Sequence, residues 1–387
     1  METYKLSDLC EILDAKRKPL SALQRAKKQG IYPYYGAQGI IDHLDEYLLD
    51  GEYLLVAEDG ANLETRNQPI ANIAKGKIWV NNHAHVLGSN GICPLNLLGF
   101  ILNSMNISPY VTGCAQPKLN QENLRNIEIE LPSHIDRIAS ILSSLDRKIE
   151  LNNKINADLE EMAQAIFKNW FVDFEPFKDG KFVNSELGMI PEGWKVGRLD
   201  EIADVVGGST PSKAKPEYYT QKGIAWLTPK DLSNHPAVYS SRGEIDITEE
   251  GYNSTSTKLM PKGTVLFTSR APIGYISIAQ DDICTNQGFK SLVPKKAGTC
   301  FLYCFLKYVT PEIENKSTGS TFKEASGALM KSLQVIIPEQ KVFEDFESIA
   351  LPLFTRIESL EKESSRLSLL RDTLLPRLMS GEIEVPE

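Results

Sequence analysis

The sequence predicts a mixed α/β (α+β) fold in which two strand-rich globular domains are separated by two long helices that pair as an antiparallel coiled coil. Three observations lead to this prediction. Residues 133–171 carry apolar side chains at alternating spacings of four and three, the pattern of a coiled-coil seam. A second stretch near the C-terminus repeats the pattern. The residues before the two stretches also match, so a globular part followed by a helix occurs twice, as a pseudo-twofold internal repeat.

The first globular domain is expected at residues 1–132. Short apolar runs such as Glu52–Val56 and Lys77–Val80 are bounded by glycine-containing turns, which is typical of strands. A segment near Leu95–Asn106 is expected to be helical. This part of the chain is therefore predicted to be strand-rich, with at least one helix.

The central helix is predicted at residues 133–171, where no glycine or proline interrupts the heptads. A lone amphipathic helix cannot bury its apolar stripe, so it needs a partner helix. Because a polar residue in a seam can fix the register, Asn152 is expected to set the distance between the two domains. The predicted seam positions are Ile138, Leu142, Leu145, Ile149, Asn152, Asn156, Leu159, Ile166 and Trp170.

A linker is predicted at 172–193, where proline, glycine and polar residues break the periodicity. The second globular domain is predicted at 194–338 and repeats the first with different side chains. Gly113–Pro132 aligns with Gly319–Pro338 without a gap. Two copies of one scaffold with different surfaces suggest two related tasks on different targets.

The second helix and a short tail are predicted at 339–387. Since the chain returns from the second domain, the two helices must be antiparallel, which places Asn152 near Ser364 and Asn156 near Leu360. Pro352 interrupts the heptads, so the helix is expected to kink there or to begin only after Leu351. Its predicted seam positions are Phe346, Leu353, Ile357, Leu360, Ser364, Leu367, Leu374 and Leu378.

The charge of the chain is concentrated in the predicted helices. Of the net charge of −9, residues 133–180 contribute 6 Lys or Arg against 9 Asp or Glu, and residues 339–387 contribute 6 against 11. The globular parts are close to neutral, so they can still carry local basic patches that bind nucleic acid. No apolar run spans a membrane, and the six cysteines, Cys114 among them, form no CxxC pair. A cytoplasmic protein with reduced thiols is expected.

A glycine-rich loop at Gly207–Lys215 is the first candidate for contact with DNA. It lacks the spacing of a phosphate-binding GxxxxGK[ST] loop. Its amides and its two lysines, Lys213 and Lys215, suit a DNA backbone, although a solvated turn is the alternative. Arg270, Asn286, Gln287 and Lys290 stand in turns after predicted strands and can pair with base edges, or they can serve the turns themselves.

The first domain carries a counterpart, Lys16–Lys18, at the same place in the repeat. His83 and His85 follow two asparagines, and three interpretations stay open: a packed histidine, a base or phosphate contact, or a metal ligand together with Cys93. No metal site is predicted. The full set of candidates for DNA contact is Lys16, Arg17, Lys18, Asn81, Asn82, His83, Lys213, Lys215, Arg270, Asn286, Gln287, Lys290 and Lys323.

The sequence shows no catalytic set. It lacks an Asn-Pro-Pro-aromatic segment for amino methylation, a glycine-rich loop fit for a methyl donor, and a carboxylate cluster with lysine for cleavage. The chain is therefore not expected to be a catalyst. A coiled-coil adaptor without a DNA role and a stand-alone methyltransferase are the alternatives to a protein that contacts DNA.

The repeat resembles the specificity subunit of type I restriction-modification systems over essentially the whole chain. The stretches that carry the resemblance are YPYYGAQGIIDHL (32–44), KIWVNNHAHVLG (77–88), IELNNKINADLEEMAQAIFKNWFVDFEPF (149–177), ELGMIPEGW (186–194), GGSTPSKAKPEYY (207–219), SRAPIGYISIA (269–279), TNQGFKSLVP (285–294) and LLPRLMSGEIEV (374–385).

The resemblance implies two target-recognition domains, each of which reads one half of a bipartite, asymmetric site on double-stranded DNA. It implies that the helices set the spacer and dock two methyltransferase subunits, which recruit the translocating restriction subunits. It also implies that S-adenosylmethionine, ATP and Mg²⁺ are used in those partners and that this chain holds no cofactor.

Overall fold

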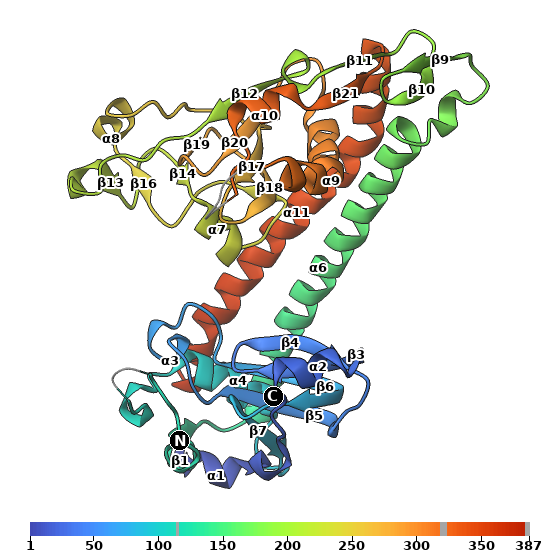
Figure 1. Cartoon of the computed structure of the whole chain (residues 1–387). Coiled ribbons are helices and arrows are strands. Elements are labelled where there is room, and N and C mark those ends of the chain that lie inside the picture. Colours follow the sequence, from blue (N-terminus) through green and yellow to red (C-terminus); the bar gives the residue numbers. More distant parts are fainter. Residues whose placement is uncertain (114–115, 318–322, 384–387) are drawn as a thin grey trace. The chain divides into compact units, whose positions relative to one another are not determined.

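The computed structural model describes residues 1–113, 116–317 and 323–383, and it divides into two compact units (Figure 1). Unit 1 comprises Met1–Ile149 and Ser365–Glu387, and unit 2 comprises Glu150–Ser364. Each unit contains one globular domain and a part of each long helix, α6 (Ile135–Phe171) and α11 (Gln340–Met379).

The globular domain of unit 1 is built on a six-stranded sheet of order β2-β7-β5-β6-β3-β4. The pairs are antiparallel except β3 with β6. The two predicted strands lie in β5 and β6 and are confirmed. The strands are β2 (Cys10–Ile12), β3 (Gln29–Gly36), β4 (Gly39–Leu44), β5 (Leu49–Ala57), β6 (Ala71–Val80) and β7 (Ala84–Ser89).

The predicted helix near residue 95 is α4 (Leu95–Ser104), whose buried Leu98 and Leu102 share a core cluster with Leu54 of β5. A second, two-stranded sheet joins β1 to β8 at the start of α6. The remaining elements of unit 1 are β1 (Glu2–Lys5), α1 (Leu6–Leu9), η1 (Asp14–Lys16), α2 (Ala22–Ala26), α3 (Asn62–Thr65), η2 (Ser108–Tyr110), α5 (Gln121–Arg125) and β8 (Glu128–Leu131).

The globular domain of unit 2 is built on a five-stranded sheet of order β12-β20-β17-β18-β15. Helix α9 (Thr299–Lys316) covers it and shares the core with Phe267 of β17 and Ile278 of β18. The strands are β11 (Lys195–Arg198), β12 (Ala203–Gly207), β13 (Tyr219–Thr220), β14 (Trp226–Leu227), β15 (Tyr239–Ser240), β16 (Asp246–Ile247), β17 (Val265–Ser269), β18 (Ile273–Ala279), β19 (Cys284–Thr285), β20 (Lys290–Pro294) and β21 (Gln334–Ile337). The shorter helices are η4 (Leu199–Glu201), η5 (Pro216–Tyr218), α7 (Pro229–Asn234), α8 (Glu249–Asn253) and α10 (Gly327–Ser332).

The two sheets have the same topology. Strands β2, β7, β5, β6 and β3 pair in unit 1 as β12, β20, β17, β18 and β15 pair in unit 2. In both sheets three of these pairings are antiparallel, and the last strand, β3 or β15, lies parallel to its neighbour. The aligned phrases before the long helices also correspond, because α5 and β8 match α10 and β21. The internal repeat is therefore confirmed.

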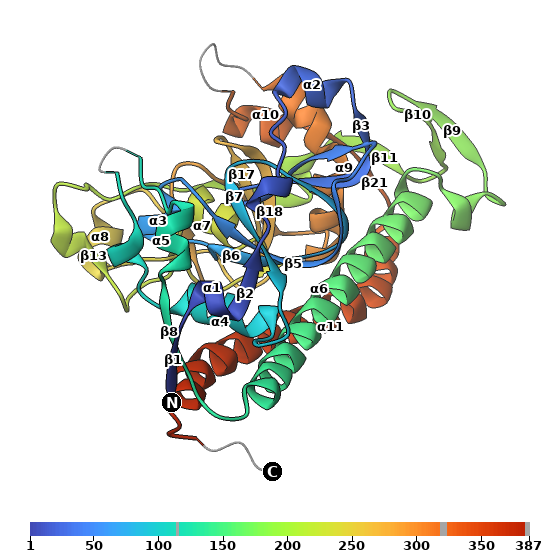
Figure 2. The ribbon, with the colours of Figure 1, turned by 90° about the horizontal axis from the view of Figure 1, so that it is seen from below.

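Helices α6 and α11 pack together in antiparallel orientation, as Figures 1 and 2 both show. In unit 1, Asp146 Oδ1 accepts a hydrogen bond from Arg371 Nη1 at 2.7 Å. In unit 2, the Asn152 Nδ2 group donates to Ser364 Oγ at 3.3 Å and to Glu363 Oε2 at 2.9 Å. The predicted register, with Asn152 beside Ser364, is confirmed.

The start of α11 differs from the expectation. The helix begins at Gln340, close to the predicted residue 339, and continues through Pro352, so of the two effects expected of Pro352 the start after Leu351 does not occur. Pro352 is exposed, and the carbonyl that loses its helical donor there can be solvated. Apolar side chains on both sides of Pro352, among them Phe346 and Phe354, are buried in the core of unit 2 and hold the helix in place.

The segment 172–193, expected as an aperiodic linker, has structure of its own. It forms η3 (Glu175–Phe177) and the hairpin of β9 (Phe182–Ser185) and β10 (Gly188–Pro191). Phe174 and Phe177 pack edge-on against Trp194, with ring centroids 5.7 and 4.8 Å apart. Aromatic packing therefore attaches this segment to unit 2.

Two half-buried glutamates of α11, Glu347 and Glu361, bind the backbone of the unit 2 domain. Glu347 Oε1 accepts the N–H of Phe301 at 3.0 Å and so caps the first turn of α9. The neighbouring residue at the N-terminus of α9 is Gly298, where a Cβ atom would overlap the Glu347 carboxylate. Glu361 accepts the N–H groups of Val238 at 2.7 Å and Tyr239 at 3.0 Å, at the edge strand β15.

The cysteines that the structure describes are free and buried: Cys10, Cys93, Cys284, Cys300 and Cys304. Burial raises the pKa of the Cys10 and Cys93 thiols to about 12, so they are protonated at neutral pH. Cys114 lies outside the described residues. Within the described part of the chain, no helix has both the length and the apolar surface to cross a bilayer.

Candidate nucleic-acid interface

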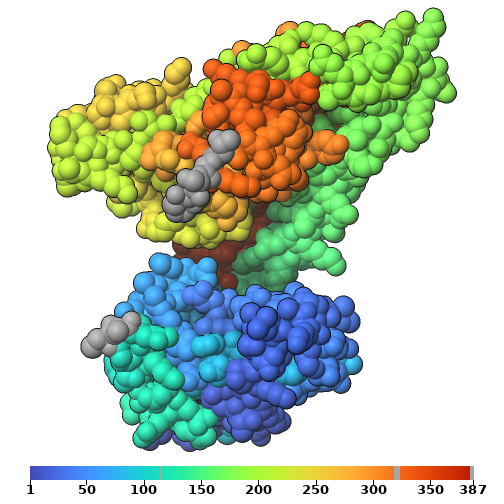
Figure 3. All heavy atoms as spheres, in the orientation of Figure 1, coloured from blue at the N-terminus to red at the C-terminus, as the bar shows by residue number. Residues whose placement is uncertain are grey.

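Most of the unit 2 candidates gather at one end of its five-stranded sheet. Gly207 at the end of β12 pairs with Lys290 at the start of β20, and Thr268 near the end of β17 bridges to Phe289. The loop after β12, the turn after β17 and the turn before β20 therefore meet. The α9–α10 region beside them forms an orange surface on the front face of unit 2 in Figure 3.

The glycine-rich loop is held close to the turn before β20. A Cβ atom at Gly208 would overlap the carbonyl oxygens of Thr285 and Asn286, so only glycine fits. The Ser209 N–H donates to the Thr285 carbonyl at 3.0 Å, and the Thr210 hydroxyl donates to the Gln287 side chain. The loop and the candidate Gln287 thus form one surface.

Two cations flank one carboxylate at this end of the sheet. Arg270 Nη1 lies 3.6 Å from Glu324 Oε2, and Lys290 Nζ lies 3.5 Å from Glu324 Oε1. These separations are long for ion pairs, and the side chains are partly exposed. Lys323, next to Glu324, is exposed. A phosphate group could take the place of this carboxylate between the two cations.

The other unit 2 candidates differ in their surroundings. The Asn286 side chain accepts the Gly288 N–H at 2.8 Å, which is the turn-stabilising role left open by the sequence. Lys215 Nζ lies 2.8 Å from the Tyr218 hydroxyl and 4.8 Å from the centre of that ring. Lys213 is exposed. Gln287, Lys213, Arg270, Lys290 and Lys323 are therefore the residues best placed to reach a partner.

The equivalent end of the unit 1 sheet holds a buried ionic network. Arg17 donates to Glu58 Oε2 at 2.5 Å and to the Ala84 carbonyl at 3.0 Å, and its guanidinium lies 3.3 Å from Asp14. Lys118 Nζ lies 3.1 Å from Glu58. Burial by itself would raise the pKa of Asp14, but hydrogen bonds from His85 and Val86 and the charge of Arg17 hold it below its usual range.

His85 is at the centre of this network and is fully buried. Its Nδ1 lies 2.6 Å from Asp14 Oδ2, and its Nε2 lies 2.7 Å from the Leu119 carbonyl oxygen. Both ring nitrogens thus lie within hydrogen-bond distance of an oxygen atom, which fixes the orientation of the ring.

Some of the residues of unit 1 that were predicted to contact DNA have partners within the domain, and the others are exposed. Arg17 and Asn81 have partners within the domain; the Asn81 side chain accepts the His83 N–H at 2.8 Å. Lys16, Lys18, Asn82 and His83 are exposed. Lys18 lies 6.0 Å above the Trp79 ring, and His83 Nδ1 lies 2.7 Å from Asp59. The accessible candidates are therefore these four.

Among the described residues, Asp14, Glu58 and His85 form one group whose ligand atoms lie within 4.8 Å of one another. Arg17 and Lys118 already neutralise the two carboxylates, and both nitrogens of His85 are engaged. Cys93, the other candidate ligand, lies in the apolar core. This arrangement fits a structural ion network better than a metal centre.

Sequence reasoning did not single out Asp14, Glu58, Lys118 or Glu324. Each is an isolated charged residue without a motif, and only the fold brings it to its partners. A weak signal was present for Asp14, which lies two residues before the candidate Lys16.

Comparison with known proteins agrees with this architecture. The type I restriction modification DNA specificity domain family matches residues 1–161 and 191–349. The chain is 34% identical to the type I restriction enzyme MjaVIII specificity subunit of Methanocaldococcus jannaschii over 99% of this chain and 93% of that protein. It is 38% identical to the MjaIX specificity subunit of the same organism, over 48% of this chain and 44% of that protein.

A solved structure has a similar fold. The S subunit of a type I restriction-modification system from M. genitalium superposes with a TM-score of 0.58 at 18% sequence identity, covering all of this chain and 96% of that one. At this identity the likeness concerns the fold alone.

The ionic network of unit 1 yields a stability prediction. Asp14→Asn should destabilise the protein by about 3 kcal/mol at neutral pH, because it leaves Arg17 and the buried His85 ring without their carboxylate partner. This loss in free energy of unfolding should be complete at pH values above the ordinary carboxyl pKa of 3.8. It should shrink as the pH falls through the lower pKa that Asp14 has in the fold. Thermal unfolding across this pH range measures it.

The matched control is Asp45→Asn, which makes the same change at an exposed position of unit 1. A loss as small as that of the control would mean that the network adds nothing to stability.

Proposed function

The chain belongs to the type I restriction-modification DNA specificity family, and from this premise we propose that each of its globular domains reads one half of a split, asymmetric DNA site. As a specificity subunit, it recognises DNA and is not itself the catalyst of the complex. One observation carries the proposal: equivalent ends of two sheets with one topology hold different polar side chains. One scaffold thus presents two chemically different surfaces.

In unit 2, the proposed contact surface is centred on Arg270, Lys290 and Gln287. Arginine and lysine bind phosphates or guanine edges, and glutamine can pair with adenine. Glu324 lies between the two cations in the free protein, and a phosphate replaces it in the complex. Arg17 in the ionic network and Asn81, which accepts the His83 N–H, have partners within the domain and are left out of the proposed surface, which then consists of Lys16, Lys18, Asn82 and His83.

Charge changes at the unit 2 surface test this proposal. Lys290→Gln should weaken DNA binding about tenfold and lower the slope of log affinity against log salt by about one, because one phosphate contact is lost. Glu324→Gln should strengthen binding, because it removes the competing carboxylate. Fluorescence anisotropy of the assembled complex on its target, first identified by methylome sequencing of the host, provides both values.

Lys341→Gln is the control, since Lys341 is exposed on α11 and paired with Asp345. An unchanged salt slope for Lys290→Gln would remove this end of the sheet from the interface. If substitutions in either domain leave binding to both half-sites unchanged, the alternative function is favoured: a coiled-coil adaptor that does not read DNA.

The long helix pair is proposed to set the spacer between the half-sites. The Asn152 side chain makes polar contacts across the pair, so it favours one register over the apolar alternatives. Asn152→Leu should raise the thermal unfolding midpoint and relax the preference for one spacer length. Binding to targets with spacers lengthened or shortened by one base pair measures that preference.

Asn153→Leu makes the same change at the next, exposed residue and serves as the control. An unchanged midpoint together with an unchanged spacer preference would show that Asn152 does not fix the register.

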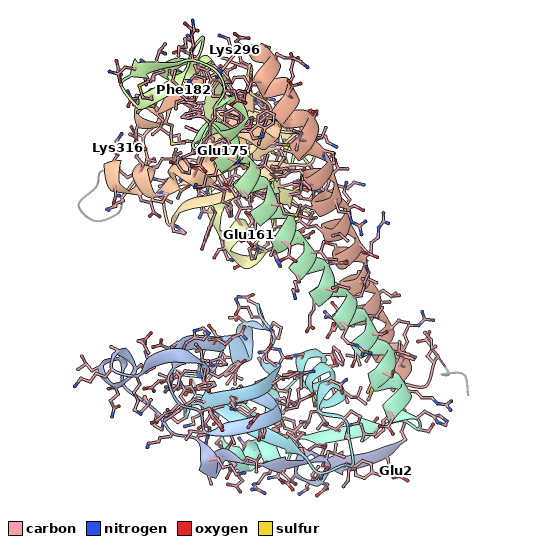
Figure 4. All side chains as sticks on the ribbon, turned by 90° about the vertical axis from the view of Figure 1, so that its right-hand side faces the viewer. Glu2, Glu161, Glu175, Phe182, Lys296 and Lys316 are labelled. Atoms are coloured by element: carbon pink, nitrogen blue, oxygen red, sulfur yellow. The ribbon has the colours of Figure 1, made fainter. Side chains whose placement is uncertain are left out.

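The helix pair is also proposed to dock two methyltransferase subunits, which recruit the restriction subunits. Support comes from large apolar side chains that are 44–70% exposed on α6 and α11: Leu151, Met162, Ile349, Leu351, Leu369 and Leu370. Acidic side chains lie among them, such as Glu161, labelled on α6 in Figure 4. In each unit, helix surfaces of this kind suit a protein partner better than a phosphate backbone. S-adenosylmethionine, ATP and Mg²⁺ are then used in the partner subunits.

Substitutions on α11 test the docking surface. The double variant Leu369→Glu, Leu370→Glu should weaken association with the methyltransferase subunit at least tenfold, because it places charges in an apolar contact. Leu23→Glu, at an exposed leucine of α2, is the control. Affinity measured by surface plasmon resonance that is equal for both variants would exclude this face.

A further inference from the structure

Each globular domain carries two neighbouring segments that contain candidates for DNA contact. The basic loop is residues 16–20 in unit 1 and residues 207–215 in unit 2. The asparagine turn is residues 81–83 in unit 1 and residues 286–288 in unit 2. In both turns the side chain of the first asparagine accepts the backbone N–H two residues further on, at 2.8 Å. The two domains therefore hold the same pair of segments.

The basic loop of unit 1 is bound to the strand that leads into its asparagine turn. The Lys18 N–H donates to the Val80 carbonyl at 3.1 Å, and the Lys18 carbonyl accepts the indole N–H of Trp79 at 2.7 Å. Two residues further on, the Leu20 N–H donates to the Tyr34 hydroxyl at 2.8 Å. Trp79 and Tyr34 pair across β6 and β3 and are only 3% and 1% exposed.

The basic loop of unit 2 is held at the same spacing. The Ser209 N–H donates to the Thr285 carbonyl at 3.0 Å, and the Ser209 carbonyl accepts the indole N–H of Trp226 at 3.1 Å. Two residues further on, the Pro211 carbonyl accepts the Tyr219 hydroxyl at 2.6 Å. Trp226 is 4% exposed, and its ring packs edge-on against Tyr219 with the centroids 5.9 Å apart.

The two indoles reach the loops from different strands. In unit 1 the indole belongs to β6, the strand that leads into the asparagine turn. In unit 2 the strand that leads into the turn is β19, and the indole comes from its parallel neighbour β14, where Trp226 pairs with Cys284. Two different local sequences thus place an indole N–H on the corresponding loop carbonyl. This recurrence indicates that each domain requires a fixed basic loop.

We propose that Trp79 and Trp226 are positioning residues for DNA recognition, and this inference rests on the function proposed above. Each indole fixes a basic loop against the neighbouring asparagine turn, so that both segments meet DNA as one preformed surface. The indoles are buried and act through the loops, whose cations Lys18 and Lys213 are exposed. A loop that is already ordered loses little backbone entropy on binding, which slows dissociation from DNA.

Hydrogen exchange in the free, full-length chain tests the effect on the loop. Trp226→Phe keeps an aromatic ring but lacks the N–H, so the backbone amides of residues 207–215 should exchange about fivefold faster than in the wild type. Tyr219→Phe removes a single oxygen atom, leaves the packing in place, and should have the same effect. Unchanged exchange of the loop in both variants would overturn the proposal.

Dissociation of the assembled complex from its DNA target tests the effect on recognition. Trp226→Phe should raise the dissociation rate about fivefold and leave the slope of log affinity against log salt unchanged, because no cation is lost. Discrimination against base substitutions should weaken in one half-site only. Trp79→Phe should have the same effects at the other half-site. Surface plasmon resonance with targets substituted in either half measures both values.

Trp194→Phe is the matched control for loss of a buried indole. Trp194 is 8% exposed and packs against Phe174 and Phe177, away from the basic loop. This variant should lower the thermal unfolding midpoint and leave loop exchange and the dissociation rate unchanged. Equal dissociation rates for Trp226→Phe and Trp194→Phe would overturn the positioning role.

Lys290→Gln separates failure of this inference from failure of the proposed function. If Lys290→Gln weakens binding and Trp226→Phe does not, the positioning role is wrong and the proposed contact surface stands. If neither variant changes binding, the contact surface of unit 2 is wrong, and the positioning role of Trp226 fails with it.

Discussion

The structure depends on one constraint: neither long helix can bury its apolar stripe alone. Within unit 1, Ile138 and Leu142 of α6 share a core with Leu375 and Leu378 of α11. Within unit 2, α6 and α11 both contribute to a larger aromatic and aliphatic core. In each unit the helix pair is thus part of the hydrophobic core of a globular domain. The polar contact of Asn152 adds a preference for one register to this apolar attraction.

The two domains show how one topology can carry two chemistries. At the same end of the sheet, unit 1 encloses His85 and Arg17 between carboxylates and the backbone, whereas unit 2 leaves Arg270 and Lys290 partly exposed around Glu324. The first arrangement is fully compensated and therefore structural. The second is loosely paired, so an incoming anion can compete for it. Surface composition can then diverge without any change in the sheet.

The architecture could be predicted from sequence because it rests on periodicity and repetition. Heptads predicted both helices, and the return of the chain predicted the pairing of Asn152 with Ser364. Pro352 left a later start of α11 open as an alternative, and that alternative fails because tertiary packing on both sides of the proline overrides its local preference. The ion networks could not be predicted, since Asp14 and His85 are 71 positions apart and meet only through the sheet. The DNA contacts remain predictions for the same reason.

The contact between Glu347 and the start of α9 has a consequence for evolution by recombination. The acceptor belongs to the helix and the N–H donor belongs to the domain, while Gly298 keeps the junction free of a side chain. A foreign domain that brings a side chain to this position must displace the Glu347 carboxylate, and the helix then loses its hydrogen bond to the start of α9. Compatibility of an exchanged domain with α11 therefore depends on this junction as well as on the DNA sequence that the domain reads.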